Sequence, residues 1–255
     1  MFNLEGKAVL ITGAGSGIGA ASARVMCEAG AKVTLAGIPA ADGEAQAAQL
    51  RAAGHEAIAV ECDVTSEQHL QAAIDATVGT FGKLDVVVAN AGIQRHRTDR
   101  DLFSMAEDEW GKTQDVNLGG VFRTCKLGLK QMLAQDSGGA FVVVSSITAI
   151  TGMSPNVSYS TTKAALLGFS RHIAVHYAAK GIRSNVVCPG ALAQTPDWGE
   201  HPDQDGRKRV MEENIPMGRL GSADDIAPTI AFLASDAAAY TTGAVVVVDG
   251  GLTVR

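Results

Sequence analysis

Short apolar runs alternate along this chain with longer Ala-rich stretches of helical pattern, and this alternation limits the folds that the sequence can adopt. Several runs, such as VVVA, FVVV and AVVVV, have almost no polar residues between the apolar ones. Strands that are buried on both faces have this composition, which is typical of a parallel sheet covered by helices. Seven runs with helical connections predict an α/β fold, a doubly wound seven-stranded parallel sheet with helices on both faces. The expected strands are Ala8–Thr12, Lys32–Ala36, Ala57–Glu61, Asp85–Ala89, Ala140–Ser145, Arg183–Cys188 and Ala244–Val248.

The length of 255 residues suits one such sheet, and no repeat, low-complexity tract or linker divides the chain. We therefore expect a single domain over residues 1–255. One segment, about residues 191–215, breaks the alternation because it contains prolines, a tryptophan and many polar residues. It follows the end of a strand, where ligands of such sheets bind, so we expect a flap over the substrate. An ordinary surface insertion is the alternative.

The formal net charge of −6 argues against a nucleic-acid binder, which needs a basic surface, and against an anionic membrane as a partner. The longest apolar runs are too short to span a bilayer, and the N-terminal sequence lacks a signal-peptide pattern. Four widely spaced cysteines without a CxxC pair indicate reduced thiols, so we expect a cytoplasmic protein. His172 and His176 are four positions apart, but nothing like HExxH is present, and we expect no metal site.

A glycine-rich loop, TGAGSGIG at residues 12–19, lies between the first expected strand and an Ala-rich helix. Glycines permit a tight turn and let the backbone approach a pyrophosphate, while the helix N-terminus offers free N–H groups. Because the loop joins a strand to a helix at the start of an α/β chain, it predicts a Rossmann-type dinucleotide site. No Gly-Lys-Ser/Thr sequence follows, which argues against a nucleoside triphosphatase.

Tyr159 and Lys163 are four positions apart at the start of a strong helical pattern, so both side chains lie on one helix face. A phenol rarely gives up its proton near neutral pH, but a nearby ammonium group favours the phenolate. The pair is therefore a candidate proton donor or acceptor, although the spacing alone is common by chance. Ser146 lies just beyond the FVVVS run, at the carboxyl end of a strand, where its hydroxyl could bind a reacting oxygen.

Taken in order, these motifs resemble those of the short-chain dehydrogenase/reductase family in its compact form, over essentially the whole chain. TGAGSGIG matches the family's TGxxxGxG loop, and ANAG at residues 89–92 matches NNAG with Ala89 in place of the first Asn. Ser146 stands thirteen residues before Tyr159, as in the family. CPG at residues 188–190 and VVDGG near the C-terminus match two further family elements.

The resemblance implies an enzyme that transfers a hydride between NAD or NADP and a secondary alcohol or ketone, with a catalytic tetrad of Asn117, Ser146, Tyr159 and Lys163. Tyr159 would be the general acid or base, and Ser146 would polarise the substrate oxygen. Lys163 would lower the pKa of Tyr159 and bind the nicotinamide ribose, and Asn117 would hold a water that relays protons. The implied cofactor-binding residues are Gly13, Ser16, Gly17, Ile18, Gly19, Gly37, Asp63, Val64, Asn90, Ala91, Gly92, Tyr159, Lys163, Pro189, Gly190 and Leu192.

The choice between NAD and NADP depends in this family on the residue that ends the second strand. A carboxylate there binds the adenosine ribose of NAD and repels the 2′-phosphate of NADP. Gly37 occupies this position, Ile38 replaces the Arg that often follows in NADP-dependent members, and Ser16 is not basic. With no cation nearby in the sequence, NAD is favoured and NADP stays open. Asp42 is a candidate substitute for the missing carboxylate, and helix capping is its alternative role. Asp63 resembles the family's adenine-contacting Asp.

The candidate walls of the substrate pocket, assigned by their placement alone, are Gln94, Met153, Trp198 and His201, and Ser146 would contact the substrate through its oxygen. The basic run Arg95-His96-Arg97 follows the NAG element and could bind an anionic substrate. A solvated loop or a subunit contact is its alternative. The family's PGxxxT element is shifted here, since Gln194 stands at the expected Thr position and Thr195 follows it. The contact of the flap with the nicotinamide carboxamide therefore stays open.

Two alternative functions fit the same motifs. One is a 3-oxoacyl-carrier-protein reductase that uses NADPH, and the other is a catalytically silent dinucleotide-sensing protein. A methyltransferase on a Rossmann-type fold is disfavoured because it gives the tetrad no purpose. Among substrates, a polyol, a sugar or another small secondary alcohol fits at least as well as an acyl thioester. The resemblance also implies a homotetramer or homodimer that pairs long helices at about Met105–Met132 and Ser158–Ala179.

Overall fold

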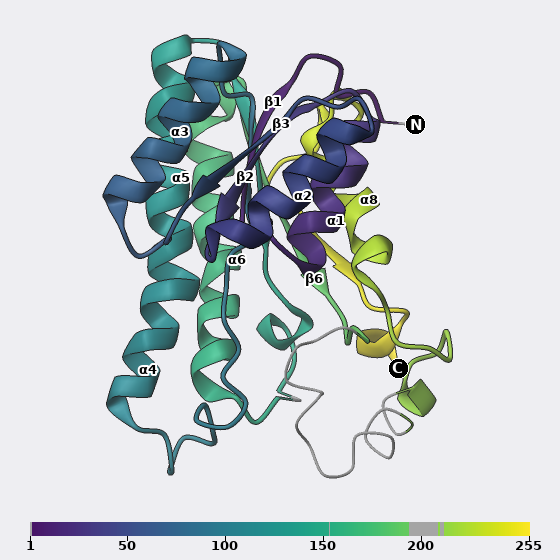
Figure 1. Ribbon diagram of the computed structural model, residues 1–255. Coiled ribbons are helices and arrows are strands. Elements are labelled where there is room, and N and C mark those ends of the chain that lie inside the picture. The colour runs from purple at the N-terminus through teal and green to yellow at the C-terminus, as the bar shows by residue number, and fades with distance from the viewer. Residues whose placement is uncertain (1, 153, 194–208, 210–211) are drawn as a thin grey trace.

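Seven strands of the computed structural model form one parallel sheet in the order β3-β2-β1-β4-β5-β6-β7 (Figure 1). The structure describes residues 2–152, 154–193, 209 and 212–255. The predicted doubly wound seven-stranded parallel sheet is confirmed, and each strand begins and ends within one residue of its expected bounds. The strands are β1 (Ala8–Thr12), β2 (Lys32–Gly37), β3 (Ala57–Glu61), β4 (Val86–Ala89), β5 (Gly139–Val144), β6 (Ile182–Pro189) and β7 (Val245–Val248).

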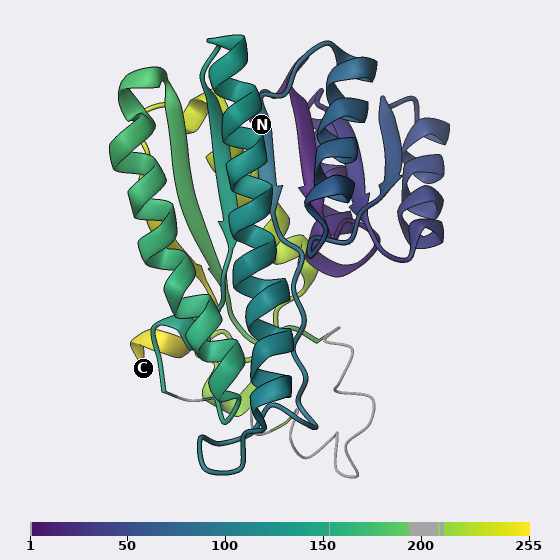
Figure 2. The same cartoon turned by 90° about the vertical axis from the view of Figure 1, so that its left-hand side faces the viewer.

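Helices cover both faces of the sheet (Figure 2). One face packs against α1 (Gly17–Glu28), α2 (Ala40–Ala52) and α8 (Ala223–Ala234), and the other against α3 (Glu67–Phe81), α5 (Gly120–Gln135) and α6 (Val157–Tyr177). Successive strand residues serve opposite faces, since Val9 and Ile11 belong to the first core cluster and Leu10 to the second. Both faces of a strand are therefore apolar, which explains the runs without polar alternation.

The expected long helix at about Met105–Met132 is a continuous helical run with an internal irregularity. It consists of α4 (Glu107–Gln114), one turn of π-helix (Asp115–Gly119) and α5. Single π-turns inside α-helices are frequent at functional sites. This turn carries Asn117, and α6 lies alongside the run (Figure 2).

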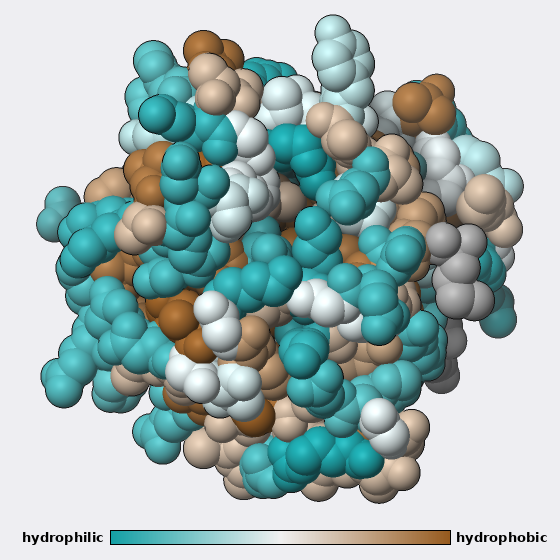
Figure 3. Space-filling model, turned by 90° about the horizontal axis from the view of Figure 1, so that it is seen from above, coloured by the Kyte–Doolittle hydropathy of each residue, from teal (hydrophilic) through white to brown (hydrophobic). Residues whose placement is uncertain are grey.

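The sheet reverses its strand order between β1 and β4, which are parallel neighbours with Val9 opposite Val86. The chain turns to β2 on one side of β1 and reaches β4 on the other, so the loops that follow β1 and β4 lie side by side. Ligands of such sheets bind at this crevice, beyond the carboxyl ends of the strands. The opposite end of the molecule presents mainly hydrophilic side chains with scattered apolar ones (Figure 3).

Most of the expected flap at residues 191–215 lies outside the described residues. Of its start, Leu192 forms an isolated parallel bridge with Gly221. Across the described part of the chain, no helix combines the length and the apolar character needed to cross a membrane. In the same residues, no three side chains of His, Cys, Asp or Glu are grouped as they would be around a metal ion.

Candidate active site

Thr12, the last residue of β1, joins the two loops at the crevice. Its Oγ1 accepts hydrogen bonds from the backbone N–H groups of Asn90 (3.1 Å) and Ala91 (3.2 Å). The Asn90 Nδ2 donates in return to the carbonyl oxygens of Thr12 (3.0 Å) and Gly13 (3.1 Å). The glycine-rich loop and the NAG element, which are predicted to bind one dinucleotide, are thus fixed to each other.

The glycines of the loop meet two different demands. A Cβ at Gly19 would lie 2.2 Å from the Gly13 carbonyl oxygen, so only glycine fits the closed packing there. Gly17 has a φ of +53°, a backbone conformation that favours glycine, and a Cβ there would meet nothing within 4 Å. The side chain of Ser16 does not cap α1, so the N–H groups of the first helical turn remain for an anion. These features fit a pyrophosphate.

Asn117 is fully buried and holds the start of the loop after β4. Its Oδ1 accepts from the Ile93 N–H at 2.7 Å, and its Nδ2 donates to the Ile93 carbonyl at 2.8 Å. A Cβ on neighbouring Gly92 would lie 3.2 Å from the Asn117 Oδ1 and 3.5 Å from the Lys163 Nζ. The amide group, the glycine and the ammonium group therefore border one small space.

Ser146, Tyr159 and Lys163 meet beyond the end of β5. Ser146 begins a short 3₁₀ turn, and its Oγ accepts from the Thr148 N–H at 3.2 Å and is hydrogen-bonded to the Tyr159 side chain. The Lys163 Nζ donates to the Val144 carbonyl at 3.0 Å and lies 5.5 Å from the centre of the Tyr159 ring. Its backbone is fixed as well, because the Ser145 hydroxyl donates to the Lys163 carbonyl at 2.8 Å.

Burial decides the protonation of this group. It raises the pKa of Tyr159 to about 12, although the hydrogen bond with Ser146 works in the opposite direction. It also lowers the pKa of Lys163 to about 8, because the ammonium form is disfavoured away from water. The expected lowering of the Tyr159 pKa by Lys163 is therefore not seen here: the ammonium is bonded to Val144, and desolvation of the phenolate dominates.

The remaining cofactor candidates lie around the same crevice. A Cβ on Gly37 would lie 3.7 Å from the Ala14 nitrogen, an ordinary contact, so a side chain would fit at this position. The pKa of Asp63 is lowered because its carboxylate accepts hydrogen bonds from the backbone and hydroxyl of Thr65. Val64 fills the space above Gly120, and Gly190 is packed closely against Asp249. Asp42 is exposed in the first turn of α2, beside Gly15.

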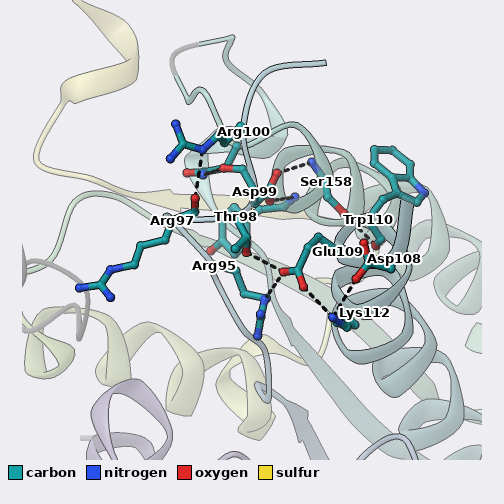
Figure 4. A network of polar contacts seen from close by, with 12 residues as sticks. Arg95, Arg97, Thr98, Asp99, Arg100, Asp108, Glu109, Trp110, Lys112 and Ser158 are labelled. Atoms are coloured by element: carbon teal, nitrogen blue, oxygen red, sulfur yellow. Dashed lines mark hydrogen bonds and ion pairs between the residues drawn. The ribbon is translucent and has the colours of Figure 1, made fainter. Parts of the chain in front are cut away.

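The loop that follows the NAG element carries several of the predicted substrate contacts and a network of polar contacts (Figure 4). Gln94 Nε2 donates to the Asn156 Oδ1 at 3.2 Å, and the His96 ring nitrogen lies 3.1 Å from the same oxygen. Arg95 forms an ion pair with Glu109 at 2.7 Å, so its guanidinium is already engaged, which favours a structural role over anion recognition. The other predicted contacts in this region, Met153, Gln194, Thr195, Trp198 and His201, lie outside the described residues.

The sequence did not point to two residues of this region, Asp99 and Asn156. Both are buried, and both connect the loop after β4 to the start of α6. A polar run such as TDRD has the composition of a solvated loop, so its one buried carboxylate is not visible in the local pattern. Only the contact with a helix 60 positions later reveals it.

Comparison with known proteins identifies the family. A family model described as enoyl-(acyl carrier protein) reductase matches residues 13–253. The L-rhamnose 1-dehydrogenase (NAD(P)(+)) of Sphingomonas sp. is 42% identical over 99% of this chain and 98% of its own. The cis-4-hydroxycyclohexanecarboxylate dehydrogenase of Sinomonas cyclohexanicum is 42% identical over 97% and 96% of the two chains. The crystal structure of a short-chain type dehydrogenase/reductase from Mycobacterium marinum has a TM-score of 0.90 at 32% identity, covering 100% of this chain and 98% of that one.

The chain therefore belongs to the short-chain dehydrogenase/reductase family. It is an oxidoreductase that uses NAD or NADP and interconverts an alcohol and a carbonyl compound.

Proposed function

We propose that this chain oxidises the secondary hydroxyl of a small polyhydroxylated molecule, a sugar or a polyol, preferring NAD, and that Tyr159 is its general acid/base. The observation that carries the assignment is the meeting of Tyr159, Ser146 and Lys163 beyond β5, next to the space bordered by Gly92 and Asn117. Groups with strongly perturbed pKa values that converge at a crevice are typical of active sites.

Each member of the group has a distinct part in the proposed reaction. The phenolate form of Tyr159 accepts the proton of the substrate hydroxyl during oxidation, and the phenol form gives a proton to the substrate oxygen during reduction. The Ser146 Oγ accepts from the Thr148 N–H and is hydrogen-bonded to Tyr159, and a substrate oxygen placed between them would accept the Ser146 proton in place of the phenol oxygen. Lys163 carries its charge at neutral pH for much of the time, since its pKa is about 8, and stabilises the phenolate as it forms. Asn117 fixes the loop that borders them.

The residues of the crevice fit a nicotinamide dinucleotide, which would accept the hydride. The open backbone at Gly17 and the uncapped first turn of α1 would hold the pyrophosphate. An ammonium group has three N–H donors. Among the described residues, the Lys163 hydrogen bond goes to Val144 alone, which leaves donors for the ribose hydroxyls. Preference for NAD rests on Gly37 and Ser16, which bring no cation to the place of a 2′-phosphate.

The substrate class is supported by polar side chains at the loop after β4 and the start of α6, and by the relatives. Gln94, His96 and Asn156 form one hydrogen-bonded group on the substrate side, and such groups recognise hydroxyls. One similar protein is a dehydrogenase of L-rhamnose, and another is a dehydrogenase of a hydroxylated cyclohexane carboxylate. These two names favour a small hydroxylated substrate over an acyl thioester.

Binding and turnover test the proposal in sequence. The purified protein is titrated in parallel with NADH and NADPH and followed by Trp fluorescence or calorimetry. It is then assayed with L-rhamnose, other aldoses, tetritols and cis-4-hydroxycyclohexanecarboxylate, and with acetoacetyl-CoA plus NADPH as the reductase alternative. Tighter NADH binding and oxidation of a polyhydroxylated substrate are expected. Tighter NADPH binding with turnover of the thioester alone would replace the proposal with the acyl reductase.

We also propose that the protein is cytoplasmic and forms a homo-oligomer. The homo-oligomer is supported by apolar side chains on the outer faces of α5 and α6, where Phe122 is 50% and Val175 is 76% exposed. The two helices run side by side and could pair with those of another copy (Figure 2). Light scattering behind a sizing column tests this, with a dimer or tetramer as the expected mass and a monomer as the contradicting one.

A further inference from the structure

The first turn of α6, which carries Tyr159, is capped by a distant part of the chain. The first three N–H groups of a helix have no partner inside it. In α6 they donate to the Arg100 carbonyl (from Val157, 3.2 Å), to Asp99 Oδ1 (from Ser158, 3.0 Å) and to Asp99 Oδ2 (from Tyr159, 2.7 Å). The side chain of Asn156, at the N-cap position, forms no capping bond.

Asp99 is only 1% exposed, which is unusual for a residue with a charged side chain. A buried charge is costly unless hydrogen bonds and an opposite charge compensate it. Two backbone N–H groups supply the hydrogen bonds, and the positive end of the α6 dipole supplies the charge. Figure 4 shows Asp99 directed at the start of α6, on the inner side of the loop. The hydrogen bonds that compensate the burial of the Asp99 carboxylate therefore come from the first turn of α6, from the backbone N–H groups of Ser158 and Tyr159.

The loop that carries Asp99 is itself fixed on several sides. At its start, Asn117 holds both polar groups of the Ile93 backbone. In its middle, Glu109 accepts from Arg95 (2.7 Å) and Thr98 (2.6 Å). At its end, the Asn156 side chain donates to the Asp99 carbonyl. Asp99 is therefore a rigid support, and it connects the element held by Asn117 to the element that carries Tyr159.

Tyr159 depends on this support more than Lys163 does. Lys163 lies one turn further into α6, where the helical hydrogen bonds hold its N–H, and Ser145 holds its carbonyl. Tyr159 is the third residue of the helix, so its N–H is held by Asp99 in place of a helical carbonyl. A shift of this first turn would move the phenol relative to Ser146 and leave Lys163 in place.

We propose that Asp99 is a positioning residue for Tyr159: its carboxylate joins the first turn of α6 to the loop after β4 and so sets the place of the phenol relative to Ser146 and Lys163. The inference rests on the proposed role of Tyr159 as the general acid/base. It assigns a task in the reaction to a residue that is buried and whose carboxylate accepts from backbone N–H groups.

Asp99→Asn is the direct test, because it keeps the size of the side chain but turns one acceptor oxygen into an NH₂ group that faces an N–H. Glu109→Gln is the matched control: it removes one carboxylate from the same loop network without touching α6 (Figure 4).

Turnover is measured with the alcohol that the wild-type protein oxidises fastest among those named above. The rate is divided by the number of NADH-binding sites, which is known from the titration. For Asp99→Asn we expect kcat per site to fall about tenfold or more, since misplacing a reacting group by 1 Å costs roughly hundredfold. KM and the Kd of NADH should stay within about twofold, a split that lost stability alone does not produce.

A second measurement needs no substrate. The chain has three tyrosines, so protein labelled with ¹³C at the tyrosine ring carbons gives few signals, and Tyr159→Phe identifies that of Tyr159. In the NADH complex, Asp99→Asn should shift or broaden the Tyr159 signal, and Glu109→Gln should leave it in place. If the wild-type protein oxidises no alcohol of the panel, the proposed function fails, and this signal still decides on Asp99.

Three results would overturn the inference. The first is wild-type kcat per site in Asp99→Asn together with an unmoved Tyr159 signal. The second is an equal loss of kcat and of NADH binding, which would indicate a collapsed site. The third is a failure of folding. If Asp99→Asn does not fold, it is replaced by Asp99→Ser, which keeps one acceptor oxygen. If neither variant binds NADH at one site per chain, Asp99 serves folding alone and the positioning role is rejected.

Discussion

The ammonium nitrogen of Lys163 lies 5.5 Å from the centre of the Tyr159 ring and donates its hydrogen bond to the Val144 carbonyl at the end of β5. Both groups are withdrawn from water, so the pKa of the amine is lowered to about 8 and that of the phenol is raised to about 12. At neutral pH the phenol keeps its proton. The site thus holds a proton donor ready for reduction, and oxidation requires that the positive charge of Lys163 stabilise the phenolate.

Tyr159→Phe is expected to abolish turnover and to leave the dinucleotide bound. Loss of a general acid/base lowers kcat by roughly 10²- to 10⁴-fold. The ring remains in place, so the Kd of NADH should change by less than about twofold. Steady-state kinetics and an NADH titration measure both quantities. Tyr177→Phe, the same change at the last residue of α6, serves as the control and should keep wild-type kcat. Full activity of Tyr159→Phe would refute the proposed mechanism.

Gly37→Asp is expected to increase the preference for NAD. A side chain fits there, because a Cβ would have no neighbour closer than the 3.7 Å to the Ala14 nitrogen. The new carboxylate would repel a 2′-phosphate, and we expect the ratio of the NADPH and NADH dissociation constants to rise about tenfold, or 1.4 kcal/mol. Gly37→Asn has the same shape without the charge. If both variants change the ratio equally, size and not charge acts at this position.

The fold was predictable because burial on both faces imposes its composition on the strands. A run such as VVVA has no other stable place in an α/β protein, and β4 begins only one residue after its expected start. The π-turn around Asn117 was not predictable: DVNLG has the composition of an ordinary helix, and the extra residue per turn is stabilised by the contacts of Asn117 with Ile93. Such contacts join residues 24 positions apart and leave no local pattern.

Gly19→Ala is expected to disrupt the dinucleotide site. The new methyl group would lie 2.2 Å from the Gly13 carbonyl oxygen, so the glycine-rich loop has to move. We expect NADH binding to weaken by at least about tenfold, or 1.4 kcal/mol, together with a lower melting temperature. Gly168→Ala is the matched control on α6, where a Cβ would meet nothing within 4 Å. That variant should gain about 1 kcal/mol from helix propensity and bind NADH normally. Equal NADH affinity in both variants would contradict the assignment of the loop.

In the candidate site, as in the fold, some features were predictable from the sequence and others were not. Residues that follow directly from strand ends, such as Ser146 and Asn90, were predictable because parallel strands bring their carboxyl ends to one edge. Arg95 was not, since its pairing with Glu109 depends on where α4 packs. The direction of the Tyr159 pKa shift was not predictable either, because burial of the phenol is a property of the whole fold.

Lys163→Met is expected to stabilise the protein while it removes activity. Lowering the pKa of a lysine from 10.5 to about 8 corresponds to a folding penalty of about 3 kcal/mol at neutral pH, at 1.36 kcal/mol for each unit. Lys163 is only 4% exposed, so solvent does little to reduce this penalty. Methionine removes the charge at similar size but leaves the Val144 carbonyl without its donor, which costs about 1 kcal/mol. The net gain is about 2 kcal/mol, or roughly 5 °C in Tm for a chain of this length.

The pH dependence separates this cause from a general change in packing. Between pH 8 and 10.5 the unfolded chain binds a proton at Lys163 that the folded protein does not, so wild-type stability gains from this residue as the pH rises. The penalty is complete below pH 8 and absent above pH 10.5. The pKa of Tyr159 is raised from 10 to about 12, so the loss of stability from its ionisation begins only near pH 10, at the upper end of the measured range. Thermal unfolding at pH 7, 9 and 10 should therefore show that the stability advantage of Lys163→Met shrinks as the pH rises. Lys180→Met, a change of an exposed lysine, should show no such trend.

If Lys163→Met is less stable than wild type at pH 7, the hydrogen bond to Val144 outweighs the desolvation of the ammonium group. The lysine then contributes to the fold as well as to the reaction.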